Sequence, residues 1–462
     1  MPGRVKEDKT RFIEINGPIE FHGQSFVVVV DLYSADYYPT DLYYSDVAAR
    51  EYASMDRHDW DYDGNHVYGE MYGGNVDRVN GMADIHVGRV PVETPADVVA
   101  FIDKITRYEK FIANDGSLLP MDFAVSILLG SANWYPNDPF LDRSAFVSEE
   151  IKHRLQNATA TDPTVPPRWI FTRRYEDYND VPEKGLNLDT CNRDTMVAAL
   201  TTGQNGVSLV SHGDHTGVCC IGLDDVNRLV NHPGIYLVLA CNTGMFDIKE
   251  EEAISERAIL NPSGGAVAYI GCSRMGSTGD GPLGEVFWEA LPSSERLGDM
   301  FKTAMLYAPY GGNRAAYNLL GDPAMRVWSD RPRHLDVSHA STSYIGQSFS
   351  VTVTSNGKPV PNALVCFTVD GTLFATCTTD VSGKASCMIT PSIDPGTLYV
   401  TVSGKNLIPY FGTVTVLLSV KDIATRCLSK YPPISVRRDI YGGSNPQDRT
   451  LREQLKLILK SC

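Results

Sequence analysis

The sequence predicts an α/β domain with a mostly parallel sheet flanked by helices, followed by an all-β sandwich of immunoglobulin type. Between residues 120 and 330, apolar runs of strand length alternate with helix-like stretches, which is typical of a parallel sheet. After the linker "SDRPRH" the composition changes to Thr, Val, Ser and Gly, and apolar and polar residues alternate between turn signals. The first pattern predicts strands buried on both faces, and the second predicts strands buried on one face.

Each strand expected in the α/β domain is a continuous apolar run, because helices cover both faces of such a sheet. The expected strands are residues 123–129, 169–172, 207–211, 236–240 and 266–270. Helices are expected between them, at residues 144–155, 193–200, 224–230 and 250–260. We therefore assign residues 120–330 to the α/β domain and residues 1–119 to an N-terminal region that precedes it.

The sandwich is expected over residues 335–418, with turns at Asn356-Gly357, Asp370-Gly371 and Ser382-Gly383. Cys366, Cys377 and Cys387 in this region allow one disulfide, whose pairing the sequence leaves open. The tail, residues 419–462, ends in an amphipathic helix whose apolar face is expected to dock on the protein, with a membrane or a partner as the alternative. That face consists of Leu451, Leu455, Ile458 and Leu459.

Charge and composition exclude several classes of function. A net charge of −15 over 462 residues, with no basic run, argues against nucleic-acid binding, which needs clustered Lys and Arg. The apolar segments fall far short of the roughly 20 residues that a transmembrane helix needs. The charged N-terminus has no apolar core of a signal peptide. The ten cysteines form no CxxC zinc pattern, and adjacent Cys219 and Cys220 are expected to be packing residues.

Two reactive side chains follow apolar strands directly. His212 lies in "VSLVSHGDHTGV" and Cys241 in "IYLVLACNTGMFD". In an open α/β sheet the ligand crevice lies beyond the carboxyl ends of the strands, so neighbouring strands would bring both residues into one crevice. A cysteine and a histidine within hydrogen-bond reach are sufficient for acyl transfer, and the N–H groups of Gly213 and Cys241 are candidate oxyanion donors. The alternative is two polar residues that merely end buried strands.

An acidic loop, "DWDYDGNHVYGE", matches the spacing of a calcium-binding loop. The candidate ligands are Asp59, Asp61, Asp63, Asn65 and Glu70, around a turn at Gly64. His66 stands where an apolar residue is usual, and the flanks are rich in Gly and Tyr. We therefore expect a structural calcium site that is not a true EF-hand, with a solvated acidic turn as the alternative.

Four sequence motifs, taken in their order along the chain, resemble those of a known protein family. "VSLVSHGDHTG", "IYLVLACNTGMFD", "GGAVAYIGCSRMGSTG" and "NLLGDPAMRVW" together resemble the gingipain family of cysteine peptidases, which has the caspase-like (caspase-hemoglobinase) fold. The resemblance covers roughly residues 27–330 and implies that His212 is the general base and Cys241 the nucleophile. It also implies bound calcium, a following immunoglobulin-like domain and a secreted or cell-surface location. Only about 30 residues precede the matching region, so the first subdomain of the family is expected to be either shortened or rebuilt.

The resemblance also indicates which segments shape the pocket for the P1 side chain of a substrate. The candidate residues are Ser211, Ala240, Ser273, Arg274, Met275 and Asp280. Asp280 would suit a basic P1 side chain, whereas Arg274 would serve structure or an acidic group, so no P1 preference is assigned. Asp214 and Asp36 are candidates for a third catalytic group that orients His212, but no motif supports either.

The leading functional hypothesis is a cysteine endopeptidase that acts on protein or peptide substrates. It needs no organic cofactor, and calcium would brace the scaffold. One alternative is a non-catalytic surface or adhesion protein that binds a partner through the immunoglobulin-like domain. The other is a peptide ligase or transpeptidase, which would share the thioester intermediate.

Overall fold

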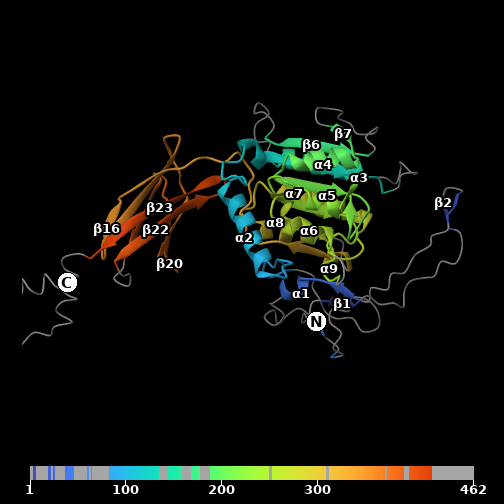
Figure 1. Cartoon of the computed structure of the whole chain (residues 1–462), viewed down its shortest axis with the longest axis horizontal. Helices are drawn as coiled ribbons and strands as arrows, with labels where there is room; N and C mark the ends of the chain where they lie inside the picture. Colours follow the sequence, from blue (N-terminus) through green and yellow to red (C-terminus); the bar gives the residue numbers. More distant parts are fainter. Residues whose placement is uncertain are drawn as a thin grey trace, which may run out of the picture. The chain divides into compact units, whose positions relative to one another are not determined.

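The chain forms two compact units in the computed structural model, residues 1–332 and 333–462 (Figure 1). The structure describes residues 4–6, 19–21, 24–26, 37–45, 60–61, 64, 83–134, 143–158, 168–176, 188–248, 252–307, 312–369, 372–389 and 395–418. Within this described part, no helix is long and apolar enough to cross a membrane. The expected amphipathic helix of the tail lies outside the described residues, so it stays a prediction.

A seven-stranded sheet forms the centre of the first unit, in the order β14-β13-β12-β8-β5-β6-β7. Its strands are β5 (Ser126–Ser131), β6 (Ile170–Tyr175), β7 (Leu188–Thr190), β8 (Gly206–Val210), β12 (Gly234–Leu239), β13 (Ala266–Cys272) and β14 (Tyr317–Leu320). All neighbours pair in parallel except β13 and β14, which are antiparallel. The predicted mostly parallel α/β sheet is therefore confirmed.

Helices cover both faces of this sheet, which explains why its central strands are apolar throughout. The helices are α2 (Pro95–Lys110), α3 (Ser144–Asn157), α4 (Arg193–Thr201), α5 (Leu223–Asn227), α6 (Ile254–Leu260), α7 (Gly281–Ala290), α8 (Leu297–Met305) and α9 (Gly312–Ala316). A side chain added at Gly206 would meet Trp288 of α7, whereas one added at Gly130 would meet Met196 of α4. Helices α7 and α4 therefore lie on opposite faces.

The sequence misplaces some boundaries for local reasons. Residues 121–125 form a 3-10 helix, η2 (Met121–Val125), so the strand expected from residue 123 begins only at Ser126. The helices expected from residues 224 and 250 are shorter, at Leu223–Asn227 and Ile254–Leu260. Edge strands β7 and β14 were not expected, because runs of three and four residues are too short to show a strand pattern.

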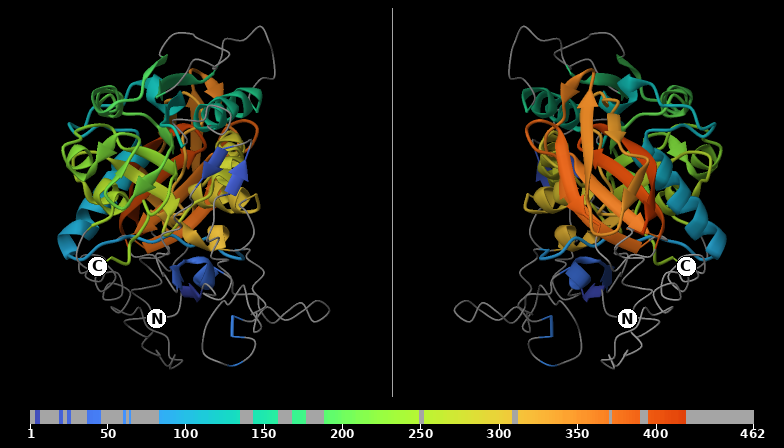
Figure 2. Two further views of the ribbon diagram at one scale, coloured as in Figure 1. Left: turned by 90° about the vertical axis from the view of Figure 1, so that its right-hand side faces the viewer. Right: turned by 90° about the vertical axis from the view of Figure 1, so that its left-hand side faces the viewer.

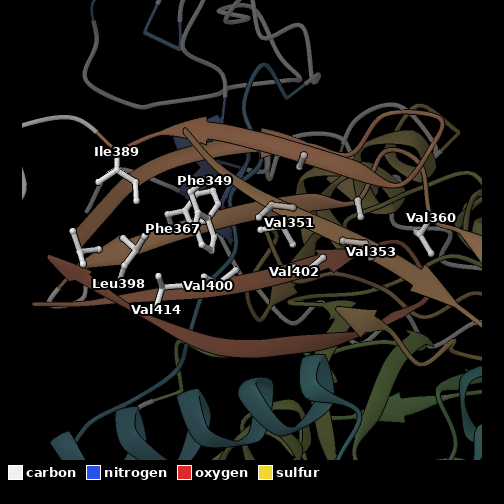
Figure 3. Packing of buried hydrophobic residues seen from close by; sticks show 14 of the residues in the cluster. Phe349, Val351, Val353, Val360, Phe367, Ile389, Leu398, Val400, Val402 and Val414 are labelled. Atoms are coloured by element: carbon white, nitrogen blue, oxygen red, sulfur yellow. The ribbon is translucent and has the colours of Figure 1, made fainter. Parts of the chain in front are cut away.

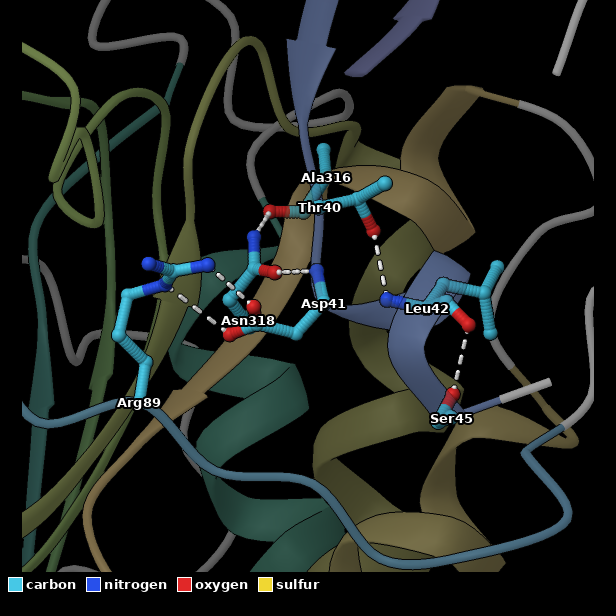
Figure 4. Close-up of polar contacts among 7 residues, drawn as sticks. All are labelled: Thr40, Asp41, Leu42, Ser45, Arg89, Ala316 and Asn318. Carbon is cyan, nitrogen blue, oxygen red and sulfur yellow. Dashed lines mark hydrogen bonds and ion pairs between the residues drawn. The ribbon is translucent and has the colours of Figure 1, made fainter. Parts of the chain in front are cut away.

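An N-terminal segment docks on the edge of the sheet. Strand β4 (Tyr37–Pro39) pairs with β1 (Arg4–Lys6), and α1 (Leu42–Ser45) follows it. Strands β2 (Ile19–Phe21) and β3 (Gln24–Phe26) pair with each other as a separate two-stranded sheet. The Asp41 N–H donates to Asn318 Oδ1 of β14 at 2.8 Å, and the Asp41 carboxylate accepts two hydrogen bonds from Arg89 (Figure 4). The hydrogen bond between Asp41 and Asn318 joins residues 277 positions apart, so it fixes the segment around Asp41 to β14.

The second unit is a sandwich of two β-sheets. One sheet has the order β15-β17-β18 with β21 beside β17, and the other has the order β16-β23-β22-β19-β20. The strands, drawn in orange and red in Figure 2, are β15 (Asp336–His339), β16 (Thr342–Tyr344), β17 (Ser348–Ser355), β18 (Lys358–Pro359), β19 (Leu364–Val369), β20 (Thr372–Thr378), β21 (Lys384–Met388), β22 (Gly396–Gly404) and β23 (Leu407–Leu417). The expected all-β region thus has the layered architecture of a sandwich.

Alternating apolar residues of both sheets fill the core of this unit. Phe349, Val351, Phe367, Val400 and Val402 are all nearly inaccessible to solvent and point into the space between the sheets (Figure 3). This is the burial that alternation of apolar and polar residues predicts. Cys366, Cys377 and Cys387, for which one disulfide was considered, form no disulfide in the described part of the structure.

Candidate active site

His212 and Cys241 stand at matching positions beyond two neighbouring strands. Strands β8 and β12 pair in parallel with Val210 opposite Leu239, and the Ser211 N–H donates to Leu239 O at 3.3 Å. His212 and Cys241 each follow that residue pair by two positions. The structure therefore brings both residues to the same carboxyl edge of the sheet, as the sequence predicts.

Gly213 holds the two loops together by close packing. A Cβ atom at Gly213 would lie 2.9 Å from Ala240 Cβ and 2.9 Å from Thr243 Cγ2. These distances are shorter than a side chain tolerates, so only glycine fits here without moving a neighbour. Because Ala240 and Thr243 flank Cys241, the loop that carries the histidine packs directly against the loop that carries the cysteine.

The imidazole of His212 is oriented by a main-chain carbonyl. His212 Nε2 lies 2.7 Å from Trp134 O, just beyond the carboxyl end of β5, the other neighbour of β8. A carbonyl can only accept, so Nε2 carries the proton of this hydrogen bond and Nδ1 of the neutral ring is an acceptor. The sequence could not reveal Trp134 in this role, because every residue has a carbonyl group.

The half-buried thiol of Cys241 contacts the loop after β13. The Gly276 N–H donates to Cys241 Sγ at 3.3 Å, and Gly276 O lies 3.9 Å from the sulfur. Burial raises the pKa of the Cys241 thiol; the Gly276 N–H opposes this shift and the Asp280 carboxylate adds to it. Within the described part of the chain, the sulfur and the imidazole of His212 are not hydrogen-bonded to each other. A protonated thiol needs a base before it can attack a carbonyl.

The loop after Cys241 is anchored on two sides. Asn242 adopts a left-handed conformation with φ of 58°, and its N–H donates to Arg274 O at 2.8 Å. The Arg274 guanidinium forms a bidentate ion pair with Asp247, with distances of 2.9 and 2.8 Å. On the other side, the Arg89 guanidinium stacks over the Phe246 ring at 4.2 Å. Arg89 thereby connects the docked N-terminal segment to the loop after Cys241.

Most candidate pocket residues make internal contacts. Ser211 Oγ donates to His212 O and accepts from the Cys219 N–H, while Ser273 Oγ donates to Ala316 O. Ala240 is buried against Gly213, and Arg274 is paired with Asp247. Met275 is 61% exposed and is the most accessible of the set. Their role in binding a P1 side chain stays a prediction.

Asp280 is buried behind the loop that contacts the sulfur. Its carboxylate accepts from the Ser277 N–H at 2.7 Å and from the Tyr317 hydroxyl at 2.9 Å, and it caps η3 (Thr278–Asp280). A Cβ atom at Gly276 would lie 3.4 Å from this carboxylate. Burial, together with the charge of Asp280, raises the pKa of Tyr317 well above its usual value. These bonds favour a structural and electrostatic role for Asp280.

Asp214, one of the two candidates for a third catalytic group that orients His212, does not contact His212 in the described structure. Asp214 Oδ1 accepts hydrogen bonds from Thr216 N, Thr216 Oγ1 and Gly217 N, so its carboxylate closes a turn. Although burial opposes the shift, these hydrogen bonds hold the pKa of Asp214 below its usual value. Asp36 lies outside the described residues.

The acidic loop is described at only three positions. The Gly64 N–H donates to Asp61 O at 3.2 Å and Gly64 has φ of 73°, which is a tight turn; Trp60 is buried beside Tyr43. Asp59, Asp63, Asn65 and Glu70 lie outside the described residues. Among the residues that the structure does describe, no group of three or more His, Cys, Asp or Glu is placed to hold a metal. The calcium site stays a prediction.

Comparisons with known proteins agree with this geometry. The profile of peptidase family C25 matches residues 3–328, and no curated protein sequence matches the chain significantly. The crystal structure of the Arg-specific cysteine proteinase gingipain R (RgpB) is 19% identical, with a TM-score of 0.57 over 76% of this chain and 79% of that chain. A complex of Porphyromonas gingivalis RgpB pro- and mature domains is also 19% identical, with a TM-score of 0.57 over 76% and 80%. The chain has their caspase-like fold and belongs to peptidase family C25, the gingipain family of cysteine peptidases.

Proposed function

We propose that the protein is an endopeptidase that hydrolyses peptide bonds through Cys241 and His212, by way of an acyl-enzyme intermediate. The observation that supports this most strongly is the packing of Gly213 against Ala240 and Thr243, which holds the two loops together at one sheet edge. Membership of a peptidase family supports protein or peptide substrates.

In the proposed reaction the Cys241 sulfur attacks the carbonyl carbon of the scissile bond. Because burial raises the thiol pKa, His212 takes the thiol proton as the sulfur attacks. The receiving atom is Nδ1, since Nε2 donates to Trp134 O. The N–H groups of Gly213 and Cys241 hold the negative charge that develops on the carbonyl oxygen, and one such donor contributes about 10²–10³-fold in rate.

The intermediate then collapses in two steps. His212 gives its proton to the leaving amine, the carbon–nitrogen bond breaks, and an acyl group remains on Cys241 as a thioester. His212 next takes a proton from water, and the hydroxyl attacks the thioester. The acid product leaves, and the proton returns to the Cys241 sulfur.

Substrate preference rests on the loops around the sulfur. We propose that Ser211, Ala240 and the segment from Ser273 to Asp280 border the P1 pocket. Gingipain R is Arg-specific. Here the acid beside the sulfur, Asp280, is already hydrogen-bonded to Tyr317 and Ser277, so we assign no P1 residue to this protein.

Digestion of a positional peptide library, read by mass spectrometry, tests the activity. We expect cleavage by the parent and by Cys387→Ser, which removes a thiol of the second unit, and loss of cleavage in Cys241→Ala. Equal cleavage by Cys241→Ala would reject the proposed nucleophile. Joined peptides would indicate a ligase, and a parent protein without turnover would favour the non-catalytic surface protein.

We also propose a structural calcium ion in the loop of Asp59, Asp61, Asp63, Asn65 and Glu70. Alternating carboxylates at this spacing repel one another unless a hard cation neutralises them. A chelator should lower the melting temperature of the parent and change that of Asp61→Ala much less. Equal shifts in both proteins would place the metal elsewhere.

The proposed location is outside the cell or at its surface, where the second unit would meet a partner. The family resemblance supports this location. Fractionation of cells that express the native protein, with immunodetection, tests it; recovery with cytoplasmic markers alone would reject it.

A further inference from the structure

Three cysteines meet beside the loop of His212. Cys191 follows β7, while Cys219 and Cys220 form the turn between β10 (Gly217–Val218) and β11 (Ile221–Gly222). Cys191 Sγ lies 4.0 Å from Cys220 Sγ and 3.8 Å from Cys219 O, and Cys220 Sγ lies 3.7 Å from Cys191 O. Cys191 is buried and Cys220 is exposed. The two thiols are therefore in contact, and one of them is open to solvent.

The turn that carries Cys219 and Cys220 is unusual for these residues. Both have positive φ, 45° and 66°. Two-residue hairpins of this kind favour Asn and Gly, because a side chain with Cβ is disfavoured in the left-handed region. Such a conformation persists only when the surroundings hold it in place.

The same turn is coupled to the loop of the proposed base. The Cys219 N–H donates to Ser211 Oγ at 3.2 Å, and Ser211 Oγ donates to His212 O. The hairpin also includes Gly213, because β9 (Gly213–Asp214) pairs with β10. A constraint on this turn therefore also constrains the main chain at Ser211 and Gly213, the residues before and after His212.

We infer that Cys191 and Cys220 are a redox pair, which closes to a disulfide in an oxidising medium and fastens the hairpin to the junction of β7 and α4. Contact between the two thiols is the main support for this pairing. Cys219 is a poorer partner for Cys220, because adjacent Cα atoms are only about 3.8 Å apart across a trans peptide, shorter than disulfides usually span. Cys219 is also 2% exposed.

A small-molecule disulfide such as oxidised glutathione supplies the oxidising equivalent. The Cys220 thiolate attacks one glutathione sulfur, the glutathione disulfide bond breaks, and a glutathione thiolate leaves. Cys191 loses its proton and its sulfur attacks Cys220 Sγ, which releases the second glutathione thiolate. The protein loses two hydrogens, and both glutathiones are reduced. The hydrogen bond from Cys191 lowers the pKa of Cys220 to about 7, which favours Cys220 as the attacking thiol.

Peptide mapping of the full chain tests the pairing. The Cys241→Ala background removes the proposed nucleophile, so the outcome is independent of whether the protein is a peptidase. After treatment with oxidised glutathione and alkylation of the remaining thiols, we expect a peptide pair joined through Cys191 and Cys220. Cys219→Ser should keep this bond, and Cys220→Ser should lose it.

The melting temperature gives a second readout. Oxidation should raise it by several degrees in the Cys241→Ala protein and in Cys219→Ser, because the bond constrains the unfolded chain. It should change little in Cys220→Ser, where the substituted side chain is exposed and the fold is retained. A bond between Cys219 and Cys220, glutathione left on Cys220 with Cys191 alkylated, or complete alkylation of all three thiols would overturn the proposal.

Discussion

The two units use the ends of their strands differently. In the first unit, the carboxyl ends of neighbouring parallel strands lie along one edge, and they carry Trp134, His212, Cys241 and Arg274. In the second unit, most strands are antiparallel, so their ends alternate between the two edges of each sheet. Those ends are tight turns, as at Asn356, where φ is 50°. A parallel sheet thus concentrates reactive groups, whereas the sandwich contributes a core and turns.

This difference predicts that the two units respond separately to mutation. Phe367→Ala removes a fully buried ring from the core of the sandwich. It should lower the free energy of unfolding of the second unit by about 3–5 kcal/mol. Peptide cleavage at 25 °C should be unchanged, because the proposed catalytic residues belong to the first unit. Calorimetry and a peptidase assay on one preparation measure both effects, and a parallel loss of cleavage would contradict the division.

Gly213→Ala, in contrast to Phe367→Ala, should reduce peptide cleavage. The added methyl group would lie 2.9 Å from Ala240 and from Thr243, so the histidine and cysteine loops must separate. We expect cleavage to fall by about 10²-fold, since small misplacements of reacting groups are that costly. Gly396→Ala is the matched control, because a Cβ there meets nothing within 4 Å. If both variants cleave like the parent, the close approach has no catalytic importance.

Asp280→Asn should produce the smallest change. The Asp280 carboxylate helps to raise the pKa of Cys241, so removing its charge should let the thiolate form at lower pH. The rate of alkylation of Cys241 by iodoacetamide, measured against pH, should shift its midpoint toward acid. As a control, Asp336→Asn in the second unit should not change the midpoint of Cys241 alkylation. An unchanged midpoint in Asp280→Asn would mean that the charge of Asp280 does not reach the sulfur, and a shift toward alkaline pH would equally contradict the expected effect.

The sequence predicts the positions of His212 and Cys241 at the strand ends, but it does not predict the residues that contact their loops. His212 and Cys241 end apolar runs long enough to indicate buried strands, and the order of strands in a parallel sheet then places such ends together. Trp134 O orients the imidazole through the main chain, which no side-chain pattern reports. Arg89 and Phe246 meet through tertiary packing alone. The candidate calcium ligands Asp59, Asp63, Asn65 and Glu70 lie outside the described residues, so the calcium site stays a prediction.

The central claim is that the imidazole of one loop acts on the sulfur of the other. The rate at which iodoacetamide modifies Cys241 at pH 7 tests it directly, followed on the Cys241 peptide by mass spectrometry. His212→Ala should slow this reaction by about 10²-fold or more, because the thiol then lacks its base, while His153→Ala should react like the parent. Equal rates in His212→Ala and the parent would contradict the claim.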